Sequence, residues 1–395
     1  TITNNTITVG GDYGIYSPDS PNSMVDGNDV SGASNGIYFG NSSGLTITNN
    51  TITVGGDYGI YSPYSPNSLF ENNDITNFIE CGIYISSSDS IVVTNNNIIS
   101  VWYETYNDSQ NTGIHNTYSY GSIFNDNNIH LSKPHGYVYG ILTSDAELHN
   151  NNIDISVFDC QYECPTLRGI IADRSIITEN SITAYYPNDC CEEDQYGINS
   201  KGIIGNPSLI LNNTLDVTLE YNGKAIYAEY ANIEGNIIVS NNSATSINIG
   251  SYSSISFNTI TSNSTSIVSN NVDSLVITNN TITSSSTAMN LSNSDVLITH
   301  NLIESQGRAI EMYNQSGGEV SNNTIISTNS ADYGIHISNL TMPVVQNNII
   351  EGFANGIYAE NDLQNQFIQN NNLWDISEEM FSGSAMPALI GVMID

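Results

Sequence analysis

The chain has 395 residues and carries 40 acidic against 6 basic side chains, which gives a formal net charge of −34 at pH 7. Only 12% of the residues are charged while 39% are hydrophobic, so most of the polar surface must be Asn, Ser and Thr, and the chain can bury a core. A charge of this sign excludes nucleic acid as a partner and argues against anionic lipid and acidic polysaccharide, because each of these needs Lys and Arg for its neutralisation.

The chain opens on a segment that it later repeats. The sequence TITNNTITVGGDYGIYSP recurs unchanged at residues 46–63, which is 45 residues after its first copy. A fixed period of this size predicts a stacked architecture rather than a globule. Because Thr1 lies inside a repeat and no signal-peptide pattern precedes it, we expect a mature or truncated product without its leader, located outside the cell at the cell surface.

Pairs of Asn followed by a small polar and an aliphatic residue, as in NNTI and NNDI, recur along the whole chain. Asn tolerates the left-handed backbone of a tight corner, and stacked Asn side chains can donate to one another coil after coil. Taking the Asn nearest the aliphatic residue as the register mark, we expect a structural Asn ladder rather than a ligand site. The predicted ladder is Asn5, Asn28, Asn50, Asn73, Asn97, Asn128, Asn152, Asn180, Asn213, Asn236, Asn258, Asn280, Asn301, Asn323, Asn348 and Asn372.

A second pattern, a small residue followed by an aliphatic residue and often by Tyr, advances together with the Asn marks. Its clearest copies read Gly-Ile-Tyr and begin at Gly14, Gly36, Gly59, Gly82 and Gly356. The two patterns define a unit of about 22 residues whose Ile, Val, Thr and Tyr stretches favour short β-strands. One unit describes one coil of a parallel β-helix, with strands paired to the next coil ~4.8 Å away. The tyrosines form either an external stacking ladder or a sugar-binding surface, and we favour the ladder.

The combined N-x-I and G-I-Y register resembles that of the right-handed parallel β-helix proteins, the pectate-lyase-like superfamily. Within it, the chain is similar to the Asn-rich repeat surface proteins of methanogenic archaea, and more narrowly to the sheath proteins of filamentous methanogens. Register and resemblance together predict an all-β fold, a single right-handed parallel β-helix (solenoid) of about sixteen coils over residues 1–385. Longer loop insertions are expected around residues 100–212, and residues 386–395 form an apolar tail, cap or assembly segment.

The five Cys residues are candidates for disulfides: Cys81, Cys160, Cys164, Cys190 and Cys191. Four of them lie in one loop-rich stretch, which lacks the His or second C-x-x-C that a zinc site requires. In an exported protein we expect these four to be oxidised and to pin the insertions, with an odd thiol left for an intermolecular bond. The sequence leaves the pairing and the identity of the odd thiol open.

The superfamily resemblance implies enzymes that cleave acidic polysaccharide with Lys or Arg, or hydrolyse glycosides with clustered Asp. Six basic residues are too few for a cationic cleft, and no Asp-Asp pair occurs. The six His residues lack a metal spacing such as H-E-x-x-H. We expect no catalytic residue, no metal ligand and no required cofactor. Calcium on oxygen ligands and paired carboxylates one coil apart are alternatives that composition leaves open.

Twelve N-x-S/T sequons occur, many of which arise by chance in a chain so rich in Asn, Ser and Thr. N-linked glycans are expected at those that fall in loops or turns. The glycosylation candidates are Asn41, Asn107, Asn290, Asn314 and Asn339.

The first hypothesis for function is a structural, self-assembling extracellular protein, such as a subunit of a sheath, surface layer or filament. Its partners would be further copies of itself and other cell-surface proteins, without membrane insertion, because the longest apolar run is far shorter than the roughly 20 residues of a spanning helix. The alternative is a secreted carbohydrate-active enzyme or glycan-binding β-helix protein.

The first coil is as regular as an internal one, and an uncovered coil exposes unpaired strand edges. We therefore expect head-to-tail or lateral self-association between the first coil and the apolar tail. The residues at this joint would be Ile2, Ile7, Val9, Leu389, Ile390, Val392 and Ile394. The alternative is that a leader covers the first coil and that the tail folds back on its own last coil.

Overall fold

The computed structural model describes residues 1–102, 110–134, 136–158, 166–186, 195–220, 222–314, 316–329, 331–338, 341, 343–360, 368–383 and 393–394. The chain forms two compact units, Thr1–Lys201 and Gly202–Asp395. Each unit is a right-handed β-solenoid built from three parallel sheets, and the two units together contain about 15 turns. The described residues form β-strands and no helix, so the all-β parallel coil architecture predicted from the repeat is confirmed.

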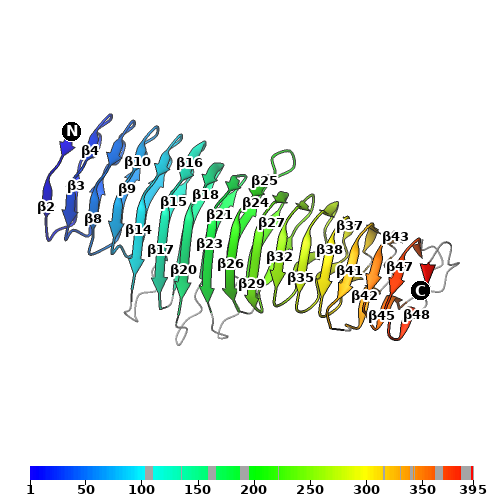
Figure 1. Ribbon diagram of the computed structural model, residues 1–395. Coiled ribbons are helices and arrows are strands. Elements are labelled where there is room, and N and C mark those ends of the chain that lie inside the picture. Colours follow the sequence, from blue (N-terminus) through cyan, green and yellow to red (C-terminus); the bar gives the residue numbers. More distant parts are fainter. Residues whose placement is uncertain are drawn as a thin grey trace. The chain divides into compact units, whose positions relative to one another are not determined.

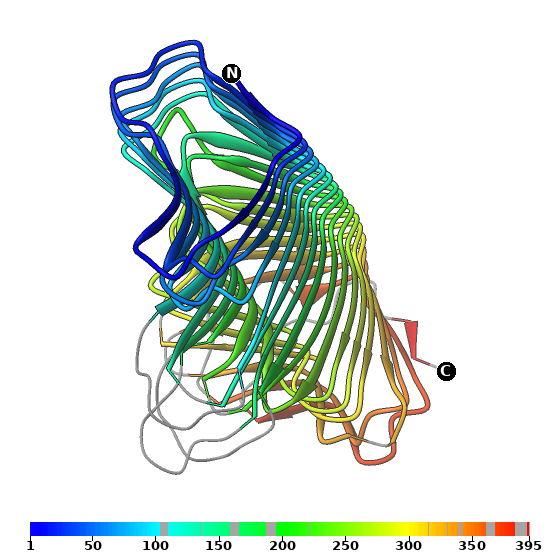
Figure 2. The same ribbon diagram turned by 90° about the vertical axis from the view of Figure 1, so that its left-hand side faces the viewer.

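Each coil passes through the three sheets in the same order, and we call the sheets A, B and C in that order. Every third strand belongs to the same sheet and pairs in parallel with the strand of the next coil, as β7 with β10 and β8 with β11. Figure 1 shows the strands of successive coils side by side, and Figure 2 shows the strands of successive coils within a unit lying one behind another.

Sheet A consists of short strands that begin each coil. In the first unit they are β1 (Ile2–Thr3), β4 (Met24–Asp26), β7 (Thr46–Thr48), β10 (Leu69–Glu71), β13 (Val92–Thr94), β16 (Ser122–Asn125), β19 (Ala146–His149) and β22 (Ile176–Thr178). In the second unit they are β25 (Ser208–Leu211), β28 (Ala231–Glu234), β31 (Ser254–Ser256), β34 (Leu275–Thr278), β37 (Asp295–Thr299), β40 (Gly317–Ser321), β43 (Val344–Gln346) and β46 (Ile368–Gln369).

Sheet B follows sheet A in every coil. In the first unit its strands are β2 (Thr6–Thr8), β5 (Asp29–Ser31), β8 (Thr51–Thr53), β11 (Asp74–Thr76), β14 (Asn97–Val101), β17 (Asn128–Lys133), β20 (Asn152–Val157) and β23 (Ser181–Tyr186). In the second unit they are β26 (Thr214–Leu219), β29 (Ile237–Asn242), β32 (Thr259–Ser262), β35 (Thr281–Ser284), β38 (Leu302–Ser305), β41 (Thr324–Ser327), β44 (Ile349–Glu351), β47 (Asn372–Trp374) and β49 (Met393–Ile394).

Sheet C carries the Gly-Ile-Tyr triplets. In the first unit its strands are β3 (Tyr13–Tyr16), β6 (Asn35–Tyr38), β9 (Tyr58–Pro63), β12 (Cys81–Ser86), β15 (Gln110–Thr117), β18 (Tyr137–Ser144), β21 (Thr166–Asp173) and β24 (Tyr196–Lys201). In the second unit they are β27 (Lys224–Glu229), β30 (Thr245–Ile249), β33 (Ile267–Asn270), β36 (Met289–Ser292), β39 (Ile310–Tyr313), β42 (Tyr333–Ile337), β45 (Asn355–Ala359) and β48 (Glu379–Gly383).

The core of each unit is a set of aliphatic rows that run from coil to coil. In sheet B, Ile52 aligns with Ile75 and Ile75 with Ile98, and all three side chains are fully buried. In sheet C, Ile60 aligns with Ile83, again without exposure. Removing these side chains from water is the main favourable contribution to folding, and the parallel register places like residues on top of one another.

The Gly of the Gly-Ile-Tyr triplet is required by a close approach between coils. A Cβ atom placed on Gly59 would lie 2.6 Å from the carbonyl oxygen of Gly82 and 2.2 Å from Cγ2 of Ile75. Neither neighbour is the end of a flexible side chain, because one is backbone and the other is a buried branch. The repeated Gly of the sequence pattern therefore marks a position at which any side chain would push the next coil away.

The corner between sheets A and B has a constant length. Two residues separate each strand of sheet A from the following strand of sheet B, the first with a positive φ and the second always Asn. Asn49, with a φ of 56°, and Gly27, with a φ of 66°, are examples of the first residue. The number of residues between sheets B and C differs from coil to coil, from two between β29 and β30 to nine between β23 and β24.

Part of the segment expected to be a separate tail continues sheet B. Strand β49 pairs in parallel with β47, so that Met393 aligns with Asn372 and Ile394 with Leu373. The pairing matches the alternative in which the tail folds onto its own last coil. The other joint residues expected in the tail, Leu389, Ile390 and Val392, lie outside the described residues.

Candidate functional site

The second residue of every A–B corner contributes to a ladder of Asn side chains, and all of these residues except Asn5 are buried. Asn50 is typical, because its Nδ2 donates to Oδ1 of Asn73 at 3.0 Å and to the carbonyl oxygens of Val25 and Thr48 at 3.0 and 2.9 Å. Its own Oδ1 accepts from the backbone N and from Nδ2 of Asn28, both at 3.0 Å. Each such amide is satisfied within the solenoid, and the ladder is therefore a structural element rather than a place for a ligand.

Each ladder residue is the Asn at the second position of its A–B corner. In the first unit they are Asn5, Asn28, Asn50, Asn73, Asn96, Asn127, Asn151 and Asn180. In the second unit they are Asn213, Asn236, Asn258, Asn280, Asn301, Asn323, Asn348 and Asn371.

Four predicted ladder positions were wrong by one residue: Asn97, Asn128, Asn152 and Asn372. Each is the first residue of its B strand, and the ladder residue is the Asn immediately before it. In each of these four coils the residue after the corner is also Asn. The Asn nearest the aliphatic residue is therefore the first residue of the B strand and not the second residue of the corner. The ladder residue is always two positions before the inward aliphatic side chain.

The displaced Asn residues of the first unit form a second ladder on the exposed face of sheet B. Asn97 donates to Oδ1 of Asp74 at 2.9 Å, Asn128 to Oδ1 of Asn97 at 2.8 Å, and Asn152 to Oδ1 of Asn128 at 2.8 Å. These contacts are open to solvent, and they again link one coil to the next.

The tyrosines of sheet C form a stack along the outer face of the first unit. The ring centroids of Tyr16 and Tyr38 are 4.9 Å apart with an interplanar angle of 16°, and those of Tyr38 and Tyr61 are 5.4 Å apart at 26°. Tyr61 and Tyr84 continue the stack at 4.9 Å and 24°. Because the rings lie face to face, Tyr38 and Tyr61 have their faces covered by neighbouring rings. A sugar ring needs an open aromatic face, so this geometry favours the stacking ladder over the sugar-binding surface.

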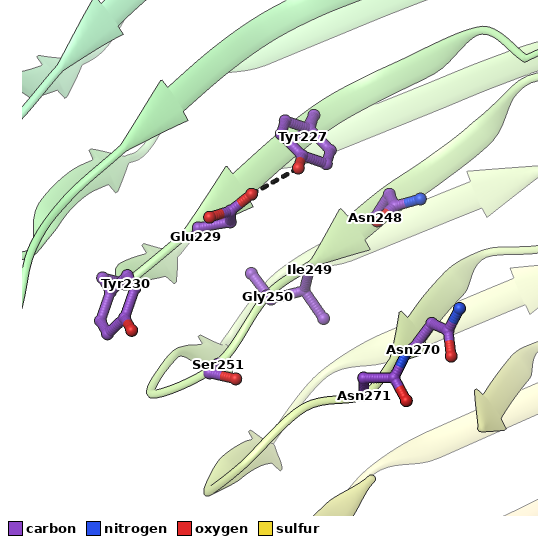
Figure 3. Close-up of a pocket in the computed structure, with 9 residues that line it drawn as sticks. All are labelled: Tyr227, Glu229, Tyr230, Asn248, Ile249, Gly250, Ser251, Asn270 and Asn271. Atoms are coloured by element: carbon purple, nitrogen blue, oxygen red, sulfur yellow. Dashed lines mark hydrogen bonds between the residues drawn. The ribbon is translucent and has the colours of Figure 1, made fainter. Parts of the chain in front are cut away.

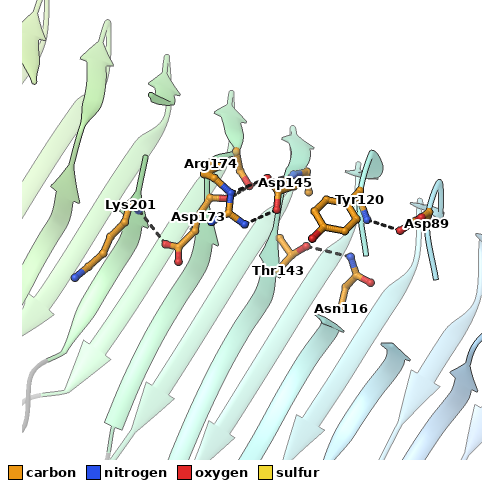
Figure 4. Close-up of polar contacts among 10 residues, drawn as sticks. Asp89, Asn116, Tyr120, Thr143, Asp145, Asp173, Arg174 and Lys201 are labelled. Atoms are coloured by element: carbon orange, nitrogen blue, oxygen red, sulfur yellow. Dashed lines mark hydrogen bonds and ion pairs between the residues drawn. The ribbon is translucent and has the colours of Figure 1, made fainter. Parts of the chain in front are cut away.

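Polar pairs at the corner between sheets C and A connect further coils of the first unit (Figure 4). Arg174 donates from Nε to Oδ1 of Asp145 at 2.8 Å and from Nη2 to Oδ2 at 2.5 Å. This bidentate contact with the Asp145 carboxylate raises the pKa of Arg174. The backbone N of Lys201 donates to Asp173 at 3.0 Å, and the backbone N of Tyr120 donates to Asp89 at 2.9 Å. The carboxylates of this corner are thus engaged in contacts between coils.

A buried histidine lies between two carboxylates on sheet C of the second unit. Nδ1 of His336 is 3.3 Å from Oε1 of Glu311, and Nε2 is 3.5 Å from Oε1 of Glu360. Arg308 also pairs with Glu311. The hydrogen bond from His336 and the charge of Arg308 hold the pKa of Glu311 below its usual value against the opposing effect of burial. The rings of Tyr333 and His336 stack at 5.1 Å.

The second unit also has a polar pocket of about 270 Å³ at the C–A corner (Figure 3). It is lined by Tyr227, Glu229, Tyr230, Asn248, Ile249, Gly250, Ser251, Asn270 and Asn271. Tyr227 donates its hydroxyl to Oε1 of Glu229 at 2.5 Å. A Cβ on Gly250 would lie 2.5 Å from Cγ of Glu229, so Gly250 leaves the space in which this carboxylate lies. Within the described chain, the side-chain amides of Asn248 and Asn270 make no hydrogen bond and are available to a ligand.

A family model for the right-handed beta helix region matches residues 1–153, 36–184, 196–348 and 249–384. The chain belongs to the right-handed β-helix family. This agrees with the coarser part of the resemblance inferred from the Asn and Gly-Ile-Tyr register.

The chain shows a distant similarity to several solved structures, including the following three proteins. The A-module of mannuronan C-5 epimerase AlgE6 from Azotobacter vinelandii is 10% identical, with 88% of this chain and 89% of that chain covered and a TM-score of 0.32. PfbA, a surface adhesin of Streptococcus pneumoniae, is 10% identical over 94% and 85% with a TM-score of 0.24. The receptor binding domain of the Siphovirus 9NA tailspike is 8% identical over 99% and 73% with a TM-score of 0.23. No curated protein matches the chain.

In this β-helix protein, one of the five cysteines that were expected to be disulfide candidates is a free thiol. Cys81 is a free thiol, 2% exposed at the start of β12, and its Sγ lies 3.2 Å from the carbonyl oxygen of Ile83. Burial raises the pKa of this thiol, so it is neither a disulfide partner nor an exposed group for an intermolecular bond. Cys160, Cys164, Cys190 and Cys191 lie outside the described residues.

The glycosylation candidates fall in different environments. Asn41 and Asn314 are exposed and have positive φ values of 54° and 55°, while Asn290 is half-buried on β36. The amide of Asn314 donates to Oγ of Ser292 at 3.1 Å. Asn107 and Asn339 lie outside the described residues. Asn41 and Asn314 are therefore the exposed candidates among the described residues, and no side-chain hydrogen bond of Asn41 is found there.

The first coil differs from its neighbours in burial. Ile2, Ile7 and Val9 are partly exposed, whereas Val25 and Val30, which align with Ile2 and Ile7 in the next coil, have no exposure.

Among the described residues, no group of three or more His, Cys, Asp or Glu side chains is arranged to hold a metal ion. The same part of the chain contains no helix of the length and hydropathy needed to cross a membrane.

Proposed function

We propose that the chain is a structural, self-assembling subunit of an extracellular layer, sheath or filament, and that it is not an enzyme. The observation that carries this proposal is the buried Asn ladder. It adds side-chain hydrogen bonds to the backbone pairing of every coil within a unit, and it therefore resists both separation and sliding of coils. Resistance of the stacked coils to stretching and sliding is the mechanical property that such an assembly requires.

The chemistry of the surface supports the same role. The carboxylates at the polar clusters are bound by neighbouring side chains of the chain itself, as Glu80 by Tyr58, Glu229 by Tyr227 and Asp145 by Arg174. These contacts connect residues of the solenoid to one another. An acidic, Asn-rich surface with an exposed sequon at Asn41 is consistent with a location outside the cell.

The net charge gives the proposal a specific dependence on salt. Copies that each carry a charge of −34 repel one another, and this repulsion is screened over about 30 Å at 0.01 M salt but over about 3 Å at 1 M. We expect the purified chain to be monomeric in dilute buffer and to form ordered polymers at high salt or with calcium. Sedimentation velocity and negative-stain microscopy across these conditions would measure this. A chain that stays monomeric at high concentration in all of them would contradict the proposal.

A matched pair of variants tests the expected joint at the first coil. Ile7→Asp places a charge on the partly exposed inward row, whereas Thr8→Asp places the same charge on an exposed neighbour. Loss of polymers with Ile7→Asp alone locates the joint on the inward row. Equal polymer formation by both variants shows that the joint lies elsewhere, for instance along the side of the solenoid.

A second candidate function, binding of a neutral glycan, is favoured by the pocket in Figure 3. Amide and carboxylate groups bind sugar hydroxyls, and the pocket offers Asn248, Asn270 and Glu229 beside the ring of Tyr230. A titration with neutral oligosaccharides, followed by calorimetry, would detect it. We expect Asn248→Ala to weaken binding and Gly250→Ala to block the space next to Glu229. Binding that both variants retain would exclude this pocket as the site.

A further inference from the structure

The tyrosine stack of the first unit ends at a pocket. The pocket has a volume of about 260 Å³ and lies on the outer face of sheet C, between strands β9, β12 and β15. The residues that line it are Tyr58, Glu80, Cys81, Tyr84, Gln110, Thr112 and His115. We call this group the aromatic corner. It is smaller than the pockets of roughly 300–1,000 Å³ that hold drug-sized ligands, so its ligand must be small.

The rings of the aromatic corner stand at steep angles to one another. Tyr84 stacks on Tyr61 at 24°, but it meets His115 at 72° with centroids 5.0 Å apart, and Tyr58 at 65° with centroids 5.6 Å apart. Three rings in these orientations line the pocket without continuing the face-to-face stack. The face of an aromatic ring carries negative electrostatic potential and attracts a cation within about 6 Å.

The remaining wall of the aromatic corner is anionic. Glu80 accepts a hydrogen bond from the Tyr58 hydroxyl at 2.5 Å, which orients the carboxylate. Asp57 is its neighbour, and the pKa of Asp57 is raised by burial and by the charge of Glu80. Burial also lowers the pKa of His115, so the imidazole is neutral near pH 7. No Lys or Arg lies among the lining residues, and the whole pocket therefore favours positive charge.

We infer that the aromatic corner binds a small alkylammonium ion, for example a quaternary ammonium group. Such an ion combines one delocalised positive charge with methyl groups that pack on aromatic rings, and aromatic walls closed by a carboxylate match both properties. A hydrated calcium ion fits less well, because it takes six to eight oxygen ligands and the pocket offers one carboxylate. This ligand site goes beyond the structural role proposed above and does not depend on it.

The test compares a cation with its uncharged isostere. Tetramethylammonium and choline are titrated into the full chain and followed by ligand-observed NMR, alongside 3,3-dimethylbutan-1-ol, which has the shape of choline without its charge. We expect saturable binding of both cations and about tenfold weaker binding of the alcohol. Equal binding of choline and the alcohol, or no saturable binding of either cation, would overturn the inference.

Variants locate the site on the aromatic corner. Glu80→Gln keeps the shape of the side chain and removes its charge, and Tyr84→Leu removes one aromatic wall; each is expected to weaken choline binding about tenfold. Tyr38→Leu is the control, because Tyr38 belongs to the same stack but does not line the pocket. If Tyr38→Leu weakens binding as much as Tyr84→Leu does, the effect comes from the stack and the assignment fails.

The same chemistry could be offered by a free solute or by a lipid headgroup. Flotation with phosphatidylcholine vesicles separates these two sources. Binding of the wild-type chain to vesicles, lost in Glu80→Gln, assigns a headgroup, whereas binding of free choline without vesicle binding assigns a soluble ligand. Vesicle binding that Glu80→Gln retains would overturn the assignment of a headgroup to the aromatic corner, because a different surface would then contact the membrane.

Discussion

Replacing Asn151 by Ala should destabilise the first unit far more than replacing Asn152 by Ala, although the two residues are adjacent. Nδ2 of Asn151 donates to the carbonyl oxygen of Phe124 at 2.9 Å and to Oδ1 of Asn180 at 2.8 Å. Its Oδ1 accepts from the backbone N and Nδ2 of Asn127 at 3.1 and 2.9 Å, and the residue is 1% exposed.

The magnitude follows from these contacts. Asn151→Ala removes all four hydrogen bonds and leaves the buried backbone N–H of Asn127 without an acceptor. A lost hydrogen bond costs about 1 kcal/mol and a buried unsatisfied group roughly 1–3 kcal/mol, so we expect a loss of about 3–5 kcal/mol in the free energy of unfolding. Asn152 is exposed and donates one hydrogen bond, to Asn128 at 2.8 Å. Its replacement should change stability by less than about 0.5 kcal/mol.

Urea unfolding followed by far-UV circular dichroism would compare the two variants. Because a solenoid can open locally, native-state hydrogen exchange of β17, β20 and β23 should accompany it. The loss in Asn151→Ala is expected to concentrate in these strands. An equal loss in both variants, or a larger loss in Asn152→Ala, would refute the assignment of the ladder to the second residue of the corner.

The other predictions concern a glycine, a thiol and a carboxylate. Gly59→Ala should destabilise the first unit in urea unfolding, because its Cβ would collide with the next coil. Gly55→Ala should be neutral in the same assay, because nothing lies within 4 Å of a Cβ at that position. Equal effects of the two variants would contradict the close-approach argument. Cys81 should react with iodoacetamide only after unfolding, because burial raises its pKa, and rapid labelling of the native chain would show that the residue is accessible. The pKa of Glu311 is lower in the folded chain than its ordinary value of about 4.5. Its ionised form therefore stabilises the fold at pH values above 4.5, and this stabilisation is lost as the pH falls through the pKa of the folded state. Glu311→Gln should therefore destabilise the second unit at pH 7 but much less at pH 3, and the same difference at both pH values would argue against the pairing with His336.

The repeat made the coil architecture predictable from the sequence. A parallel solenoid places equivalent residues on top of one another, so a regular spacing of Asn and Gly-Ile-Tyr translates directly into three sheets. The ladder register was not fully predictable, because the inward aliphatic residue, and not the Asn nearest to it, defines the corner. In the segment Asn95, Asn96 and Asn97, three identical residues hold three different positions: the positive-φ residue, the ladder residue and the first strand residue.

The candidate sites depended on details that the register alone does not contain. Glu311 and His336 each follow an aliphatic residue of sheet C, so their alignment could have been inferred from the repeat. The second partner of the histidine, Glu360, lies beyond a strand end, where sequence spacing gives no position. The orientation of the aromatic rings on sheet C could not be predicted from the sequence either. Tyr61 and His115 occupy equivalent places relative to Tyr84, yet one stacks on it and the other stands edge-on.

The contrast between the two corners that flank sheet B divides the chain into parts that can change in length and parts that cannot. An insertion at the A–B corner would break the ladder and displace every later coil by a residue. An insertion between sheets B and C leaves both neighbouring strands in register, and the sequence itself varies in length there. Foreign peptides should therefore be accepted between β11 and β12 or between β20 and β21. The protein could in this way serve as a scaffold that displays several unrelated loops at intervals set by the stacking of its coils.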